Sequence, residues 1–117
     1  MRLSKEGREK LERKFEEFKK VKFPKIASSA FPTKIAEKEA AHLHLDLVEY
    51  DSFIASFVSR LYKGQDVDPE KVYINGGLKH RLEDFGKRCP EALSFVEGHL
   101  SYLDNVHRLI RASKGIS

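Results

Sequence analysis

The chain has 117 residues, of which 40% are hydrophobic and 34% are charged, and its formal net charge is +4. This length and this mixture of residues predict a single folded domain over 1–117 and exclude a chain that stays disordered for lack of core-forming side chains. One cysteine, Cys89, excludes an intramolecular disulfide, and the absence of an apolar signal region or of a membrane span of ~18 residues predicts a cytoplasmic protein.

The charge changes sign twice along the chain. Residues 1–38 hold twelve Lys or Arg and six Asp or Glu, a net charge of +6. Residues 39–70 hold two and seven, a net charge of −5, and residues 71–117 hold eight and five, a net charge of +3. Segments of opposite sign attract each other within one chain or between copies of it.

The first predicted element is a helix over 4–20, for which Ser4 can serve as the N-cap. Its large apolar side chains form one narrow stripe, which predicts a helix that docks on a single surface: Leu11, Phe15 and Phe18. Two prolines then interrupt the helical pattern over 21–33. Because this segment is too apolar for a free linker, we expect it to lie across the bundle and to bury its large side chains: Val21, Phe23, Ile26 and Phe31.

Residues 33–63 form the strongest predicted element. Thr33 can cap this helix, and Gly64 stands where a left-handed residue would end it. Nine apolar side chains fall at helical spacing within one wedge: Ala36, Ala40, Leu43, Leu47, Tyr50, Ile54, Phe57, Val58 and Leu61. A helix of this size is roughly 45 Å long. That is long for a small domain, so we expect a central spine or a dimer interface.

The remaining chain predicts shorter helices. Asp68 and Pro69 indicate a short helical turn over 69–74. A helix over 78–88 is expected to point Leu78, Leu82 and Phe85 inward, and one over 90–113 is expected to point Leu93, Val96, Leu100, Leu103 and Ile110 inward. These elements together predict an all-α, four- to five-helix bundle built around the long helix.

One side of the long predicted helix carries imidazole and carboxylate groups. The candidate metal ligands are spaced three or four residues apart on two predicted helices: Glu39, His42, Asp46 and Glu49 on one, Asp104 and His107 on the other. If the two helices pack together, these groups could bind a divalent cation such as iron, manganese or zinc. The simpler interpretation is a charged helix edge on which His42 bonds to Asp46. Of the other histidines, we expect His44 to meet water and His99 to lie at the edge of the buried face.

The N-terminal region is rich in basic residues, which phosphate backbones attract through counterion release. The candidate nucleic-acid-binding residues are Arg8, Lys10, Arg13, Lys14, Lys19, Lys20, Lys22 and Lys25. The simpler interpretation is a self-paired, solvated face, because five glutamates alternate with these bases at short helical spacing. No signature of a known nucleic-acid-binding module is present.

Three functional hypotheses follow. The first is a non-catalytic interaction module that self-associates, as a dimer or higher oligomer, and binds a macromolecular partner. The second is a small basic protein associated with RNA or single-stranded DNA. The third is a metal-binding helical bundle, with or without enzymatic activity. The sequence identifies no cofactor, and it contains no P-loop, Gly-x-Ser-x-Gly or His-Glu-x-x-His motif.

Overall fold

The computed structural model describes residues 3–26 and 31–115, and within them all regular elements are helical. These elements are α1 (Lys5–Phe18), α2 (Lys34–Tyr62), the 3-10 turn η2 (Pro69–Lys71), α3 (Gly76–Arg88), the 3-10 turn η3 (Pro90–Ala92) and α4 (Leu93–Ser113). The predicted all-α bundle around one long helix is therefore confirmed. Within the same residues no helix has the length and apolarity needed to cross a membrane.

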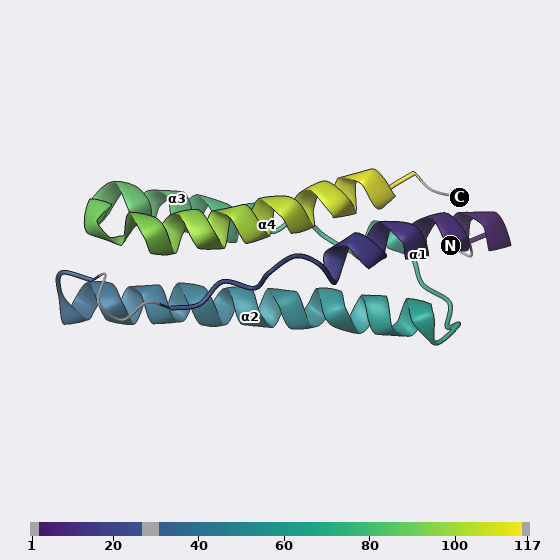
Figure 1. Cartoon of the computed structure of the whole chain (residues 1–117), viewed down its shortest axis with the longest axis horizontal. Helices are drawn as coiled ribbons and strands as arrows, with labels where there is room; N and C mark the ends of the chain where they lie inside the picture. Colours follow the sequence, from purple (N-terminus) through teal and green to yellow (C-terminus); the bar gives the residue numbers. More distant parts are fainter. Residues whose placement is uncertain (1–2, 27–30, 116–117) are drawn as a thin grey trace.

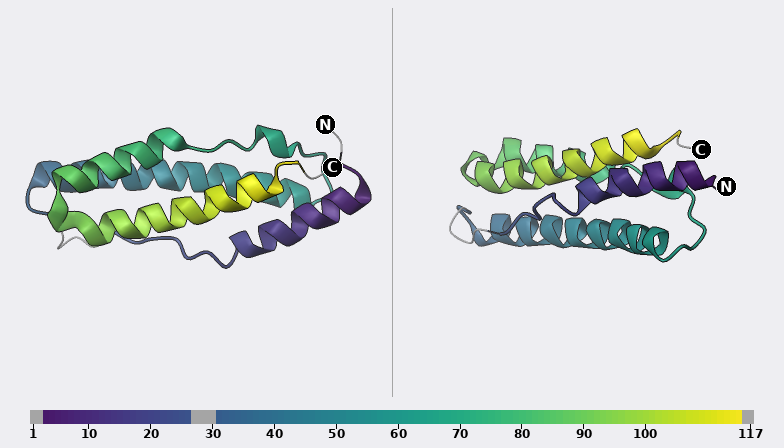
Figure 2. Two further views of the ribbon diagram at one scale, coloured as in Figure 1. Left: turned by 90° about the horizontal axis from the view of Figure 1, so that it is seen from above. Right: turned by 45° about the vertical axis from the view of Figure 1, so that its right-hand side comes forward.

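The helix α2 is the spine of an elongated molecule that measures 52 × 21 × 18 Å (Figure 1). The short helix α1 lies beside its C-terminal half and α3 beside its N-terminal half, while α4 runs next to both (Figures 1 and 2). A cross-section thus contains α2, α4 and either α1 or α3, because α1 and α3 cover different halves of α2 on opposite sides of α4 (Figure 2). The length of α2 is therefore explained by its neighbours in the same chain, without a second copy.

The ends and the buried face of α2 are those that the sequence predicts. The Thr33 side chain accepts a hydrogen bond of 3.0 Å from the Ala36 N–H, and Gly64 has a φ of 77°. Except for the half-buried Ala36, the predicted apolar wedge is buried, and Ala40, Leu47, Ile54 and Leu61 are fully enclosed. The capped termini and this continuous wedge keep the helix unbroken.

The inward face of α4 differs from the prediction. Leu93 was expected to point inward, but it is 52% exposed at the first turn. Large groups that the single predicted stripe omits are buried: Phe95, His99, Tyr102, Val106, His107 and Leu109. Because α1, α2 and α3 all pack against α4, it buries a wider face than a helix that rests on one neighbour.

The irregular segment after α1 lies along the bundle, as predicted. The Phe23 ring packs edge-on against Tyr102, with ring centroids 5.0 Å apart, and Phe31 packs in the same way against Phe95 at 5.5 Å. The prediction is wrong for Ile26, which is 40% exposed. Residues 27–30 of this predicted loop lie outside the described part of the chain.

A pair of histidines beneath this segment connects α2 to α4. His99 is fully buried, and its Nδ1–H donates to the Phe95 carbonyl at 2.8 Å, so its Nε2 is left as an acceptor. The Nδ1–H of His44 donates to that Nε2 at 2.9 Å. The predictions of a solvated His44 and a boundary His99 are both wrong, because Phe23 covers His44 with its ring 5.6 Å away.

A second buried histidine holds the segment before α3. The Nε2 of His107 accepts the Asn75 backbone N–H at 3.0 Å, so the neutral ring carries its proton on Nδ1. Within the described residues this Nδ1 has no hydrogen-bond partner. Burial lowers the pKa of both His99 and His107 to about 4, and it also lowers the pKa of His44. The hydrogen bonds accepted by the Nε2 atoms of His99 and His107 require these two rings to be neutral.

We predict that the protein loses stability in mild acid. The unfolded chain binds these protons with a pKa near 6.5 and the folded chain with a pKa of about 4, so falling pH favours the unfolded state within this window. Above pH 6.5, the pKa of the histidines in the unfolded chain, the free energy of unfolding is fully retained. By about pH 5 it falls by on the order of 2 kcal/mol for each fully buried histidine. Urea unfolding followed by circular dichroism should therefore give a lower midpoint at about pH 5 than at about pH 7.5.

The controls are two single substitutions. His99→Leu should flatten the dependence of the urea midpoint on pH, because it removes one buried titrating ring. His80→Gln, which replaces an exposed histidine, should keep the wild-type dependence. Equal wild-type midpoints at the two pH values would contradict the prediction.

Candidate functional site

The helix α1 separates its basic and acidic side chains. Lys10, Arg13 and Lys14 border the space between α1 and α4. On the side that faces α2, the Tyr62 hydroxyl donates to the Glu16 carboxylate at 2.8 Å. Glu16 therefore lies on another face of the helix, whereas Glu17 borders the same space as the bases and Glu6 pairs with Lys10.

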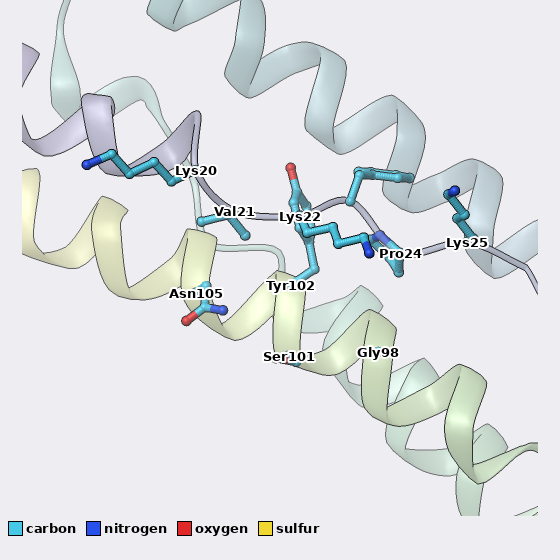
Figure 3. Close-up of a pocket in the computed structure, with 10 residues that line it drawn as sticks. Lys20, Val21, Lys22, Pro24, Lys25, Gly98, Ser101, Tyr102 and Asn105 are labelled. Atoms are coloured by element: carbon cyan, nitrogen blue, oxygen red, sulfur yellow. The ribbon is translucent and has the colours of Figure 1, made fainter.

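Three neighbouring cavities lie between α4 and the N-terminal region. The largest, of about 580 Å³, lies between the 20–25 segment and α4 (Figure 3). It shares Val21 and Asn105 with a cavity of about 230 Å³, which in turn shares Lys14, Glu17 and Ala112 with a third of about 280 Å³. We call these three adjoining cavities together the basic groove.

The walls of the basic groove carry seven cationic side chains: Lys10, Arg13, Lys14, Lys20, Lys22, Lys25 and Arg108. The acidic residue among its lining is Glu17. In the described part of the chain, Lys10 has an ion pair, an exposed one of 3.6 Å with Glu6, and the other six lie beyond 4 Å of any carboxylate. Charges of one sign along a concave surface reinforce each other, so the groove has a positive potential.

The structure places six of the eight predicted nucleic-acid-binding residues in this groove and two elsewhere. The Arg8 guanidinium donates to the carbonyls of Leu61 and Gln65 and so caps the C-terminal end of α2. Lys19 faces α2, where its Nζ lies 4.1 Å from the centroid of the Tyr62 ring. On a helical projection, Arg8 and Lys19 each lie more than roughly 100° from Lys10 and Lys14. The sequence alone could therefore have shown that these two residues face another side of the helix.

Helix α4 supplies the second wall of the basic groove, which was not predicted from the sequence. Ser101, Asn105 and Arg108 line the groove opposite the N-terminal region, and Figure 3 shows Ser101 and Asn105 on α4 across from Lys20 and Lys22. The Arg108 guanidinium donates to the Asn105 side chain, which keeps it at the groove. These residues are spaced four and three apart on the polar flank of α4, a pattern that could have identified them.

The groove has the length to hold several anionic groups in a row. From Lys10 to Lys20 the helix and its last turn rise by roughly 15 Å, and the extended segment from Lys20 to Lys25 adds up to roughly 16 Å. A polymer with regularly spaced phosphates could contact most of these cations at once. A single small anion would contact two or three.

The six predicted metal ligands do not converge. Glu39 pairs with Arg88, Asp46 with Arg81 at 2.7 Å, Asp104 with Lys79 at 3.0 Å, and His107 accepts the Asn75 N–H, while His42 and Glu49 are exposed. The hydrogen bond from Arg88 lowers the pKa of Glu39. Residues 3–26 and 31–115 contain no group of three or more His, Cys, Asp or Glu side chains that could hold a metal ion. Three of the four carboxylates instead pair with lysine and arginine side chains of α3.

Comparison with known proteins gives no match: no protein-family model, no curated protein and no solved structure is significantly similar to this chain.

Proposed function

We propose that this protein is a non-catalytic binding module whose basic groove holds the backbone of a single-stranded nucleic acid. The observation that supports this proposal is the row of seven cations along one concave surface, six of them without an ion pair in the described residues. Lysine and arginine side chains bind phosphates mainly by releasing condensed counterions, which requires no sequence motif.

The shape of the groove favours a single strand over a duplex or a membrane. A flexible strand can enter a concave cleft between a loop and a helix, whereas a duplex or a lipid surface contacts convex or flat basic faces more readily. The half-buried Phe23 also lies in the lining of the largest cavity, where its ring offers a stacking partner for an unpaired base.

The first test of this proposal neutralises three groove cations together, as Lys14→Gln, Lys20→Gln and Lys22→Gln. Fluorescence anisotropy with fluorescein-labelled oligo-dT and oligo-rU measures affinity across a series of salt concentrations. Each lost phosphate contact removes about 0.7 from the slope of log affinity against log salt, so the slope should fall by about 2. Affinity at low salt should fall by roughly 10- to 100-fold.

The matched control changes three exposed lysines outside the groove, as Lys63→Gln, Lys71→Gln and Lys87→Gln. This triple variant has the same net charge as the first, so equal losses in both would show that general attraction, rather than the groove, binds the strand. Negligible binding of wild-type protein at low salt would reject the proposal. Tighter binding of a duplex of equal length, or of vesicles with anionic lipid, would also overturn the single-strand assignment.

A second observation supports self-association, the other part of an interaction-module function. The outward side of α2 carries small or apolar residues at alternating intervals of four and three: Ala41, Leu45, Val48, Ser52, Ala55 and Ser59. Leu45 is 60% exposed and Val48 is 37% exposed. Such spacing is the heptad pattern by which two helices pack side by side, and small residues permit a close approach.

We infer that a second copy packs on this face in an antiparallel orientation. A parallel pair would place Lys34 and Lys38, which continue the same heptad positions, against their own copies. An antiparallel pair centred near Leu47 avoids this repulsion and places Leu45 against Val48 of the second copy.

Leu45→Glu should therefore shift the protein from dimer to monomer, because it places charged groups at the centre of the interface. Analytical ultracentrifugation over a range of protein concentrations measures this shift. The matched control is Leu93→Glu, which changes a leucine of similar exposure on α4 and should leave the dimer intact. A wild-type protein that stays monomeric at the highest concentrations would contradict self-association.

A further inference from the structure

A small acidic pocket lies apart from the basic groove, where α2 meets the segment before α3. Its volume is about 330 Å³, within the range of small-ligand sites. The lining residues on which the inference depends are Asp46, Glu49, Phe53, Tyr73 and Arg81. None of them lines the basic groove, so the inference does not depend on the proposed function.

Two aromatic rings form one wall of this pocket and remain open to solvent. Phe53 is 41% exposed and Tyr73 is 48% exposed, with ring centroids 5.1 Å apart and planes tilted by 47°. Large exposed rings held side by side are unfavourable in water and provide negative faces that attract cations.

Buried groups hold the aromatic wall in place. The hydroxyl of the buried Tyr50 donates to the Tyr73 carbonyl, and the Tyr50 ring packs 5.2 Å from the Tyr73 ring. Two residues later the Asn75 N–H donates to the buried His107. The segment that carries Tyr73 is thereby fixed at two points, so a ligand would find the wall already ordered.

The edge of α2 that leads into the pocket already binds guanidinium groups. Arg88 of α3 donates to Glu39 and, at 2.8 Å, to Asp84, and its guanidinium carbon lies 5.9 Å from the centroid of the Phe85 ring. One heptad further along, Arg81 pairs with Asp46. Arginines seven residues apart on α3 therefore meet carboxylates seven residues apart on the antiparallel α2.

Towards the pocket, the arginines of α3 end before the residues of α2 that could bind a guanidinium group. Helix α3 begins at Gly76, so beyond Arg81 it presents no further cation to α2. Glu49 and Phe53 continue the edge by one turn each, and the carboxylate of Glu49 has no ion pair or hydrogen bond within the described residues. The pocket therefore holds two carboxylates and one guanidinium, which leaves one negative charge beside two open rings.

We propose that this pocket binds a guanidinium group, which stacks on the Phe53 and Tyr73 rings and donates two parallel hydrogen bonds to the Glu49 carboxylate. A guanidinium is planar and weakly hydrated, so it combines stacking with a bidentate carboxylate contact, whereas an ammonium is a compact, strongly hydrated charge. The group can come from a free small molecule or from an arginine side chain of a polypeptide.

Titration of the 15N-labelled protein with Nα-acetyl-arginine amide tests the proposal by NMR. Chemical shifts should change around Glu49–Phe53 and Tyr73–Leu78, with a Kd on the order of 1 mM for one side chain. The matching lysine amide should bind at least several-fold more weakly. Glu49→Gln and Phe53→Ala should each weaken the arginine compound about tenfold, and Glu97→Gln, which changes an exposed carboxylate of α4, should not.

A neutral peptide with one central arginine distinguishes the two sources. Tighter binding of the peptide than of the amide assigns the pocket to a polypeptide partner, and equal binding assigns it to a small guanidinium compound. Shifts spread over the whole protein, equal affinity for the lysine amide, or unchanged affinity in Glu49→Gln would overturn the proposal. Before titration, the NMR spectrum of each variant should match that of the wild-type protein outside the substituted site, which confirms that the variant is folded.

Discussion

The structure depends on the burial of one continuous apolar wedge along α2. That wedge is longer than any single partner helix in the described chain, because α1 has 14 residues and α3 has 13, whereas α2 has 29. Helix α1 therefore covers one half of it and α3 the other, and α4 packs along both halves (Figure 1). The hydrophobic effect makes this arrangement favourable, since exposing either half would leave several leucine and phenylalanine side chains in water.

Covering one long helix with two short ones has a structural consequence at the places where the short helices stop. The chain after α1 and the chain before α3 are irregular, yet both lie on the core and must have their polar groups satisfied. At the second place the neutral His107 accepts the Asn75 N–H, and beneath the first the neutral His99 bonds to His44, on which the Phe23 ring packs. The basic groove and the acidic pocket are built on these same two segments, so their geometry depends on buried rings that are stable only without a proton.

Regular elements were predictable and irregular ones were not, for physical reasons that particular residues illustrate. Helix α2 follows from apolar periodicity with Thr33 and Gly64 at its ends, all of which are local signals. The burial of His44 is not local, because it depends on where the 20–26 segment lies relative to α2. Leu93 and Phe95 show the same limit on α4: one apolar stripe gives one buried direction, whereas contact with three helices buries several. The candidate ligands Glu39 and Asp46 were correctly placed on one helix edge, but nothing in their spacing showed that arginines of α3 would occupy them.

The distribution of charge connects the two candidate sites. In the sequence the acidic middle segment has two basic segments to attract, and within the described residues three of its carboxylates pair with the C-terminal one. Glu39, Asp46 and Glu70 pair with Arg88, Arg81 and Lys114, all from the C-terminal third. Helices α1 and α3 lie on opposite sides of α4 (Figure 2), so Glu39 and Asp46, which pair with α3, do not meet the cations of the basic groove. Six of the seven groove cations therefore have no ion pair among the described residues, and the groove is left to attract an external polyanion.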